Sequence, residues 1–230
     1  MNRLTPDYVV ATSNGMNKVI PAIIANSAEE LEKMIRAVEP FVDRVHLDVM
    51  DGVFVSGKTI SYHEELAKIQ TNLNFDVHLM VNNPEDQMYF WYQTKADRFL
   101  IHAESQTDLR GLIDQIHSNK RMVGLVLNPK TPADVIYELV DDVDLVQFMT
   151  VEPGEYGADF VEDVVYKIQD FHTKYPAVPI GVDGGIHPEN HNIAKLKAAG
   201  ASIFVLGSHI FSEDRDVGKA IAELQEAVQN

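Results

Sequence analysis

Two histidines and two aspartates stand at the ends of apolar, strand-like runs, and their side chains are the ones most suited to chemistry. His46 and Asp48 lie two residues apart in one run, His78 ends a second run, and Asp183 ends a third. Each histidine taken alone is more simply explained as a packed, hydrogen-bonded side chain. Together, two imidazoles and two carboxylates form a ligand set that suits Zn, Fe(II), Mn or Co better than Mg or Ca. The sequence therefore predicts that these four residues bind one divalent metal ion.

The elements that carry these residues alternate in type along the chain. Short apolar runs of β-type composition predict strands, and the longer segments between them show the spacing of amphipathic helices. Several helical segments begin with Pro or Asp, and Gly200 follows one of them where a C-terminal cap is expected. The predicted strands are residues 19–24, 44–48, 74–80, 98–102, 122–127, 145–150, 179–183 and 203–206. The predicted helices are residues 28–38, 62–70, 84–92, 107–119, 132–140, 159–175, 188–199 and 215–228.

This alternation of strand and helix, without a linker-like stretch, predicts a fold of the α/β class. We expect residues 19–230 to form a single domain, a (β/α)8 TIM barrel, and residues 1–18 to form an N-terminal arm or extra helix. The alternative is a doubly wound open sheet, but no Gly-rich dinucleotide turn follows the first strand. In a (β/α)8 barrel, chemistry takes place at the carboxyl ends of the strands, which is where the metal-ligand candidates stand.

The two aspartates are the predicted catalytic pair. Side chains two apart on a strand face the same way, so His46 and Asp48 both point into the barrel mouth while Leu47 points outward. A carboxylate that binds a metal through one oxygen can exchange a proton through the other. With Asp48 and Asp183 on either side of a substrate, one removes a proton from a carbon and the other returns a proton to the opposite face, which inverts the carbon. The metal would stabilise the enediolate formed between the two steps.

Two further aspartates lie near these segments. Asp76 shares a face with His78, one layer deeper in the barrel, where it could orient a metal ligand or make a buried structural hydrogen bond. Asp51 lies beyond its strand, and capping of the next turn is the favoured interpretation.

Glycine-bearing turns after the last strands predict a phosphate site. Gly184 and Gly185 follow the seventh strand, and Gly207 and Ser208 follow the eighth. In barrels these two loops often bind phosphate through backbone N–H groups, and glycine permits the close approach. Gly157 joins these candidates from the loop after the sixth strand, a segment that is either a lid or a static connector.

Three methionines stand at or near strand ends. Met50, Met80 and Met149 either fill the core, as most methionines do, or form an apolar cap beside the reacting carbon of the substrate.

The composition excludes several classes of partner. The net charge of −16 makes nucleic acid and anionic membranes poor partners, and the absence of cysteine excludes disulfides and thiolate ligands. No apolar run approaches the ~18 residues of a membrane helix, and the N-terminus lacks the layout of a signal peptide. We therefore expect a cytoplasmic protein whose anionic ligand is held by a metal and by helix or backbone dipoles.

The motifs, taken together and in order, resemble the ribulose-phosphate 3-epimerase family. The resemblance implies a phosphate-binding barrel that interconverts D-ribulose 5-phosphate and D-xylulose 5-phosphate, and it implies a homo-oligomer. It places metal ligands at His46, Asp48, His78 and Asp183, and makes the two aspartates the acid–base pair. It also implies that Met50, Met80 and Met149 form a cap near the substrate. The matching blocks, over most of residues 19–212, are HLDVMDGVFV, DVHLMVNNP, HAES, GLVLNPKTP, VDLVQFMTVEPG, GVDGGI and FVLGSHIF.

This chain departs from that family's pattern around the substrate. The first strand usually reads Pro-Ser-Ile-Leu-Ser, and one of its serines contacts substrate, whereas here Ala22 and Ala25 replace both serines. Residues 55–62, and residues 152–158 around Glu152, also differ from the usual loops. Two alternatives are therefore kept: the same chemistry on another ketose phosphate such as allulose 6-phosphate, and a non-catalytic barrel that binds a sugar phosphate. A related decarboxylating barrel family resembles the chain less well, because its Asp-x-Lys-x-x-Asp pattern has no matching lysine here.

Overall fold

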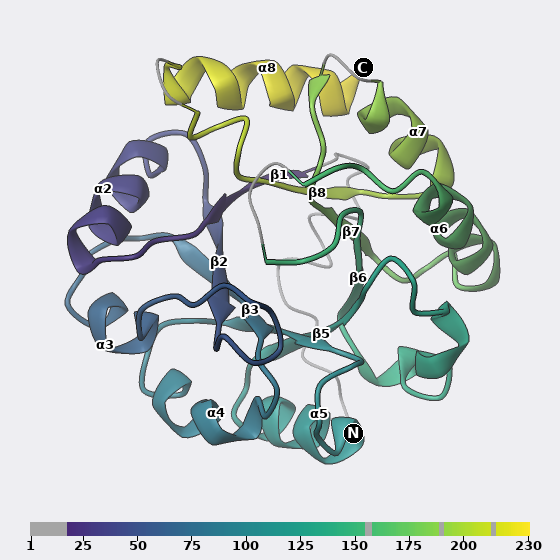
Figure 1. Cartoon of the computed structure of the whole chain (residues 1–230), viewed down its shortest axis with the longest axis horizontal. Coiled ribbons are helices and arrows are strands. Elements are labelled where there is room, and N and C mark those ends of the chain that lie inside the picture. The colour runs from purple at the N-terminus through teal and green to yellow at the C-terminus, as the bar shows by residue number, and fades with distance from the viewer. Residues whose placement is uncertain (1–17, 155–157, 189–190, 213–214) are drawn as a thin grey trace.

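Eight parallel strands form a closed barrel, in which each strand pairs with the next along the chain and β8 pairs with β1. The computed structural model describes residues 18–154, 158–188, 191–212 and 215–230. Figure 1 shows the strands at the centre with the helices around them. The predicted (β/α)8 fold is therefore confirmed. The strands are β1 (Lys18–Ile23), β2 (Arg44–Met50), β3 (Asn74–Met80), β4 (Arg98–His102), β5 (Met122–Leu127), β6 (Leu145–Met149), β7 (Ile180–Asp183) and β8 (Ile203–Leu206).

Seven α-helices are found in the described residues, and they form the outer layer of the barrel. Lys18, which the sequence assigned to the arm, begins β1, and residues 1–17 lie outside the described residues. The helices are α2 (Ala28–Val38), α3 (Tyr62–Leu66), α4 (Glu85–Trp91), α5 (Leu109–Ser118), α6 (Asp163–Lys174), α7 (Asn192–Ala199) and α8 (Val217–Gln229).

Local capping explains where several helices begin and end. The hydroxyl of Ser27 accepts a hydrogen bond from the backbone N–H of Glu30 at the start of α2. The carboxylate of Asp216 plays the same part at the start of α8. Gly200 ends α7 with a φ of 114°, a conformation that glycine adopts without strain, as the sequence predicted.

One predicted helix is wrong. Residues 132–140 contain only a 3-10 turn at Ala133–Ile136, and a second turn follows at Val140–Asp142. Val135 and Ile136 are β-branched, which lowers helix propensity. The carboxylates of Asp141 and Asp142 would also stand at the C-terminus of the expected helix, where the helix dipole disfavours negative charge.

The wall of strands separates two apolar layers. Side chains on its outer face, such as Leu47 and Val77, pack against the helices in the larger core cluster. Side chains on its inner face, such as Leu100, Leu145 and Val205, fill the barrel itself. The alternation along each strand therefore decides which side chains enter the barrel.

Candidate active site

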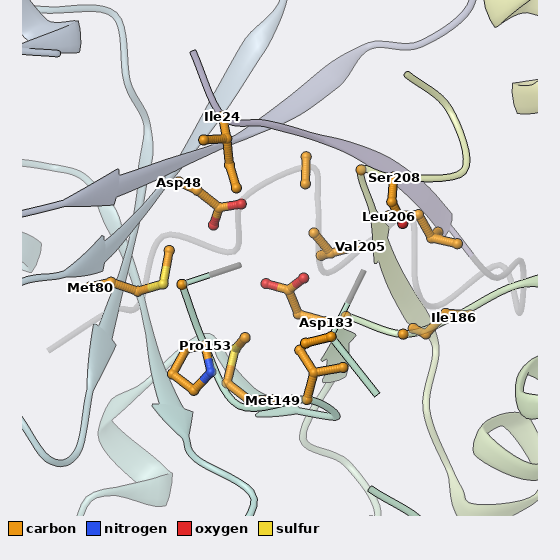
Figure 2. A pocket seen from close by; sticks show the side chains of 17 residues that line it. Ile24, Asp48, Met80, Met149, Pro153, Asp183, Ile186, Val205, Leu206 and Ser208 are labelled. Atoms are coloured by element: carbon orange, nitrogen blue, oxygen red, sulfur yellow. The ribbon is translucent and has the colours of Figure 1, made fainter. Parts of the chain in front are cut away.

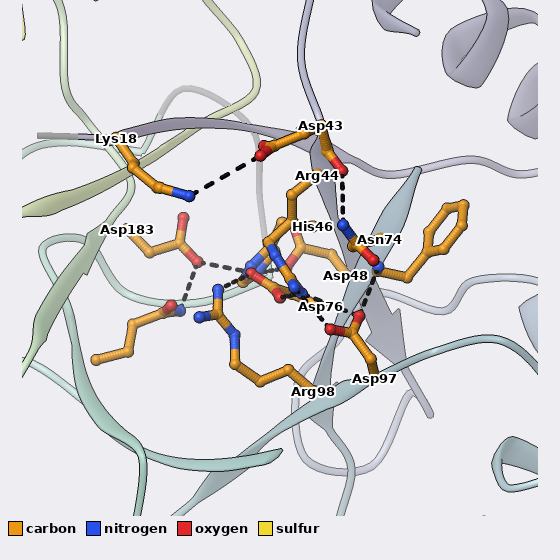
Figure 3. A network of polar contacts seen from close by, with 12 residues as sticks. Lys18, Asp43, Arg44, His46, Asp48, Asn74, Asp76, Asp97, Arg98 and Asp183 are labelled. Atoms are coloured by element: carbon orange, nitrogen blue, oxygen red, sulfur yellow. Dashed lines mark hydrogen bonds and ion pairs between the residues drawn. The ribbon is translucent and has the colours of Figure 1, made fainter. Parts of the chain in front are cut away.

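The four predicted metal ligands come together at the carboxyl ends of β2, β3 and β7. The register between β2 and β3 places Asp48 beside His78, and His46 lies two residues earlier on β2. Asp183 is the last residue of β7. One ligand atom from each residue lies within 4.8 Å of the others, and all four residues are buried. Figure 3 shows His46, Asp48 and Asp183 converging inside the barrel. The four side chains form a cluster that could hold a metal ion.

The distances within the cluster show that each carboxylate turns one oxygen toward the histidines. Oδ1 of Asp48 lies 2.7 Å from Nδ1 of His78 and 3.3 Å from Nε2 of His46. Oδ2 of Asp183 lies 3.4 Å from Nε2 of His46 and 3.6 Å from Nδ1 of His78. The other oxygen of each aspartate is left for the substrate side of the site.

The electrostatics of the cluster favour a cation. Burial disfavours the charged form of His46, but Asp183 and Asp48 outweigh it and raise the pKa of His46 to about 10. Burial also acts against ionised Asp48, yet His46 and His78 hold the pKa of that carboxyl below its usual range. Both ring nitrogens of His46 are buried without a hydrogen bond among the described residues, although Nε2 is within ion-pair distance of Asp48 and Asp183. A divalent cation would suit this cluster, because it would accept a lone pair from one nitrogen of each histidine and neutralise the two carboxylates.

A pocket opens beside this cluster, and the two aspartates stand on its wall. Asp48 and Asp183 both line the pocket, and Figure 2 shows their carboxylates facing each other across it. Met80 and Met149, two of the three residues expected to form a cap, line the pocket as well. The arrangement places two carboxylates and an apolar wall around any bound molecule.

Met50 is not among the residues that line this pocket. The chain after β2 folds back through an antiparallel bridge between Asp51 and Lys58, and this brings Gly57 over Met50. A side chain added at Gly57 would meet the sulfur of Met50 at 2.8 Å. The structure therefore packs Met50 under the loop, a position that strand alternation alone did not predict.

Four of the five predicted phosphate-binding residues line the same pocket. They are Gly184, Gly185, Gly207 and Ser208; Gly157 lies outside the described residues. Gly184 has a φ of 101°, and a Cβ at this position would collide with Val151. Among the described residues, no lysine or arginine lines the pocket. An anion bound there would depend on backbone N–H groups and a hydroxyl.

Sequence reasoning missed a partner of Asp183. The carboxamide of Gln147 donates a hydrogen bond of 3.0 Å from Nε2 to Oδ2 of Asp183, the oxygen that faces the histidines. Gln147 is almost completely buried on β6, two residues before Met149. A polar amide within an otherwise apolar strand was the available signal, because such a group needs a buried partner.

A second missed group lies behind His78. Nε2 of His78 lies 2.9 Å from Nε2 of His102, and Nδ1 of His102 lies 3.1 Å from Oε2 of Glu104. Burial lowers the pKa of His102 to about 4. Burial acts against ionised Glu104, but hydrogen bonds from His102, Thr131 and Asn128 outweigh it and lower the pKa of Glu104 to about 2. The signal in the sequence was a histidine, His102, at the end of β4, followed two residues later by the carboxylate of Glu104.

Asp76 and Asp51 have structural partners. Asp76 lies between Arg44, at 2.6 Å, and Arg98, so it is a buried ion-pair partner (Figure 3). Oδ1 of Asp51 accepts hydrogen bonds from the backbone N–H groups of Val53 and Phe54, which confirms the predicted turn cap.

The fold and the cluster define a class of protein, a (β/α)8 barrel with a candidate metal site at the carboxyl ends of its strands. Solved structures share this fold at low identity. A 3-hexulose-6-phosphate synthase matches with a TM-score of 0.69 at 18% identity, over 92% of this chain and 99% of that chain. An orotidine 5'-monophosphate decarboxylase from Sulfolobus solfataricus matches with a TM-score of 0.66 at 11% identity, over 93% and 98% of the two chains. These likenesses show the fold alone.

Sequence comparison gives the family. Residues 18–211 match the model of the ribulose-phosphate 3 epimerase family. The cytoplasmic isoform of ribulose-phosphate 3-epimerase from Oryza sativa subsp. japonica is 35% identical over 222 residues, 92% of this chain and 94% of that protein. The ribulose-phosphate 3-epimerase of Bacillus subtilis is 36% identical over 217 residues, 91% of this chain and 99% of that protein. The chain belongs to the ribulose-phosphate 3-epimerase family and is an isomerase, which confirms the resemblance seen in the sequence.

The helices also bear on membrane association. In the part of the chain that the structure describes, every helix is too short or too polar to cross a lipid bilayer.

Proposed function

We propose that this protein is a metal-dependent epimerase that inverts C3 of D-ribulose 5-phosphate to give D-xylulose 5-phosphate. The observation that carries the proposal is the placement of Asp48 and Asp183 on facing walls of one pocket. A single base could remove and return a proton only on its own face of a carbon, whereas two facing acids can invert it.

Each aspartate takes a defined part in this reaction. One carboxylate removes the C3 proton through its substrate-side oxygen, and the protonated partner gives a proton to the opposite face. In the reverse reaction the two residues exchange roles. A divalent ion held by His46, Asp48, His78 and Asp183 would supply positive charge that stabilises the enediolate oxygens. Met80 and Met149 form an apolar wall that keeps water from the carbanionic carbon.

The phosphate of the substrate is assigned to the turns after β7 and β8. Gly184, Gly185, Gly207 and Ser208 line the pocket and offer backbone N–H groups without an added cationic side chain. Backbone N–H groups would allow a protein with a net charge of −16 to bind a phosphate.

A second candidate substrate is another ketose phosphate, such as allulose 6-phosphate. The methyl group of Ala22 lines the pocket, at the position of the first serine in the resembled pattern. Ala25 is fully buried in the outer core cluster and does not line the pocket, so its replacement does not bear on the substrate. The pocket therefore lacks one hydroxyl that would form a hydrogen bond with a sugar oxygen.

The test is turnover in deuterated water. We expect the metal-loaded protein to convert D-ribulose 5-phosphate to xylulose 5-phosphate with deuterium at C3, and Asp183→Asn to abolish the conversion. The absence of product and of exchange would contradict the proposal. A higher kcat/KM for a ketohexose phosphate would favour the second candidate. If ligand binds without turnover, the chain is instead a non-catalytic sugar-phosphate-binding barrel.

We also propose that the protein acts in the cytoplasm as a homo-oligomer, with a sugar phosphate as its small-molecule partner. The cytoplasmic relative from Oryza sativa supports the location. Light scattering on the purified chain would give the oligomeric state.

A further inference from the structure

A chain of three polar side chains runs from the metal-ligand cluster to the loop after β5. Nδ1 of His78 faces the cluster, and its Nε2 meets Nε2 of His102 at 2.9 Å. The planes of the two rings are inclined by 21° to each other, and the ring centroids are 5.0 Å apart. With the nitrogens in contact, this geometry is an edge-to-edge hydrogen bond between rings that are nearly coplanar. His102 and Glu104 are not members of the four-residue cluster.

Binding of a cation at Nδ1 of His78 would fix the position of the ring hydrogen on both His78 and His102. A ligating nitrogen offers a lone pair, so the ring hydrogen of neutral His78 is on Nε2. Nε2–H can donate to His102 only if Nε2 of His102 is unprotonated. The hydrogen of His102 is then on Nδ1, where it donates to Oε2 of Glu104 at 3.1 Å.

The reverse arrangement is disfavoured by Glu104. If His102 donated from Nε2, its Nδ1 lone pair would face the carboxylate of Glu104, and two acceptors would be in contact. Glu104 is itself fixed, because Oε1 accepts a hydrogen bond of 2.9 Å from the backbone N–H of Asn128. The carboxylate therefore has a donor on each side, and its position is set by β4 and the loop after β5.

We propose that His102 and Glu104 are positioning residues that select the Nε2–H tautomer of His78 and aim its Nδ1 at the metal. The proposal rests on the proposed metal-binding role of the cluster. Groups that hold a metal-ligating histidine in this way typically change metal affinity about 10–100-fold when they are replaced. Asp76, the candidate for this role in the sequence, is instead paired with two arginines.

The direct test is histidine 15N NMR on the zinc-loaded protein. We expect His78 to be protonated at Nε2, and His102 to be protonated at Nδ1 with Nε2 unprotonated. His102 protonated at Nε2 would overturn the proposal. This measurement needs no variant, so a folding defect cannot obscure it.

Variants test the same point through zinc affinity, measured by competition with a chelator. In Glu104→Gln one of the two carboxylate oxygens becomes an NH2 group. The side chain can then no longer accept hydrogen bonds from both His102 and Asn128 in their present positions. We expect an affinity loss of about 10–100-fold. His102→Leu should lose a similar factor, whereas His102→Gln, which can accept from His78 and donate to Glu104, should restore most of the affinity. A role limited to holding the loop would lower Tm without changing affinity or the His78 tautomer.

The control is an exposed histidine–carboxylate pair. His117 lies 3.2 Å from Asp144 at the surface, and His117→Gln should bind zinc as the wild type does. Failure of the wild type to bind zinc would remove the proposed metal site, and this inference with it. Binding by the wild type with equal affinity in Glu104→Gln and His102→Leu would overturn the positioning role alone.

Discussion

Among single residues, Asp183 and Asp48 differ in the side chains that contact their carboxylates. Asp48 contacts both histidines through Oδ1, whereas Oδ2 of Asp183 also accepts a hydrogen bond from Gln147. This bond ties the inner oxygen of Asp183 to β6 and leaves Oδ1 toward the pocket. The orientation of one proposed catalytic carboxylate thus depends on a buried amide that belongs to a different strand.

Gln147→Leu should lower kcat, because it removes the buried hydrogen bond that orients Asp183. Hydrogen bonds to charged groups contribute about 1.5–3 kcal/mol, which corresponds to a loss of about 10–100-fold in rate if the full bond orients Asp183 in the transition state. Steady-state kinetics and thermal unfolding would be compared with Gln169→Leu, a change at an exposed position of α6. An unchanged kcat would contradict the orienting role.

At the scale of elements, the inner faces of β2, β3 and β4 carry a buried ion-pair network next to the candidate metal cluster. The register pairs Asp76 with His46 on one side and with Arg98 on the other. Arg44 joins the network from β2 and also contacts Asp97 at 2.6 Å. β2 and β3, which carry three of the four candidate ligands, are therefore linked by charge as well as by backbone hydrogen bonds.

Asp76→Asn should destabilise the fold by about 3–5 kcal/mol near neutral pH, because it leaves buried arginine charge unpaired. Burial acts against ionised Asp76, but Arg98 and Arg44 outweigh it and lower its pKa. A lowered pKa in the folded state gives stability that is present above the unfolded pKa of about 3.9 and is lost as the pH falls below it. The variant should therefore lose less stability on acidification than the wild type.

Urea unfolding followed by the fluorescence of Trp91, the single tryptophan, would measure both effects. Asp142→Asn removes the exposed pair with Arg110 and should change stability by less than about 1 kcal/mol. Equal acid sensitivity of Asp76→Asn and the wild type would contradict the role given to Asp76.

For the whole molecule, the candidate metal cluster connects strands that are far apart in sequence. His46 and Asp48 come from β2, His78 from β3 and Asp183 from β7, so an ion at this site would tie the two halves of the barrel together. A ligand that binds only the folded state stabilises it by mass action.

Removal of the metal should lower Tm. An ion present at about 100 times its Kd contributes about 2.7 kcal/mol, or roughly 5–10 °C in Tm for a chain of this size. Scanning calorimetry with zinc and with EDTA would measure the difference. His46→Ala should lose the dependence on zinc, whereas His117→Gln should keep it. A wild-type Tm that is the same in zinc and EDTA would contradict metal binding by the folded barrel.

The sequence by itself determined the features that depend on short-range order. The strand alternation predicted that His46 and Asp48 face inward together, and the order of strands and helices predicted the barrel. Since a barrel brings the carboxyl ends of all strands to one face, His78 and Asp183 followed without any knowledge of contacts. The glycines after β7 and β8 were found for the same reason.

The tertiary structure decided what depends on register and loop path. Strand alternation shows that a side chain enters the barrel, but the shear between neighbouring strands decides which inner residues meet. That shear pairs Asp76 with arginines and brings His102 to His78. The fold-back of the chain after β2 covers Met50. The packing of β6 against β7 brings Gln147 within hydrogen-bond distance of Asp183. The contacts of Asp76, His102 and Gln147 join residues 22 to 36 positions apart in the sequence, so no local pattern could contain them.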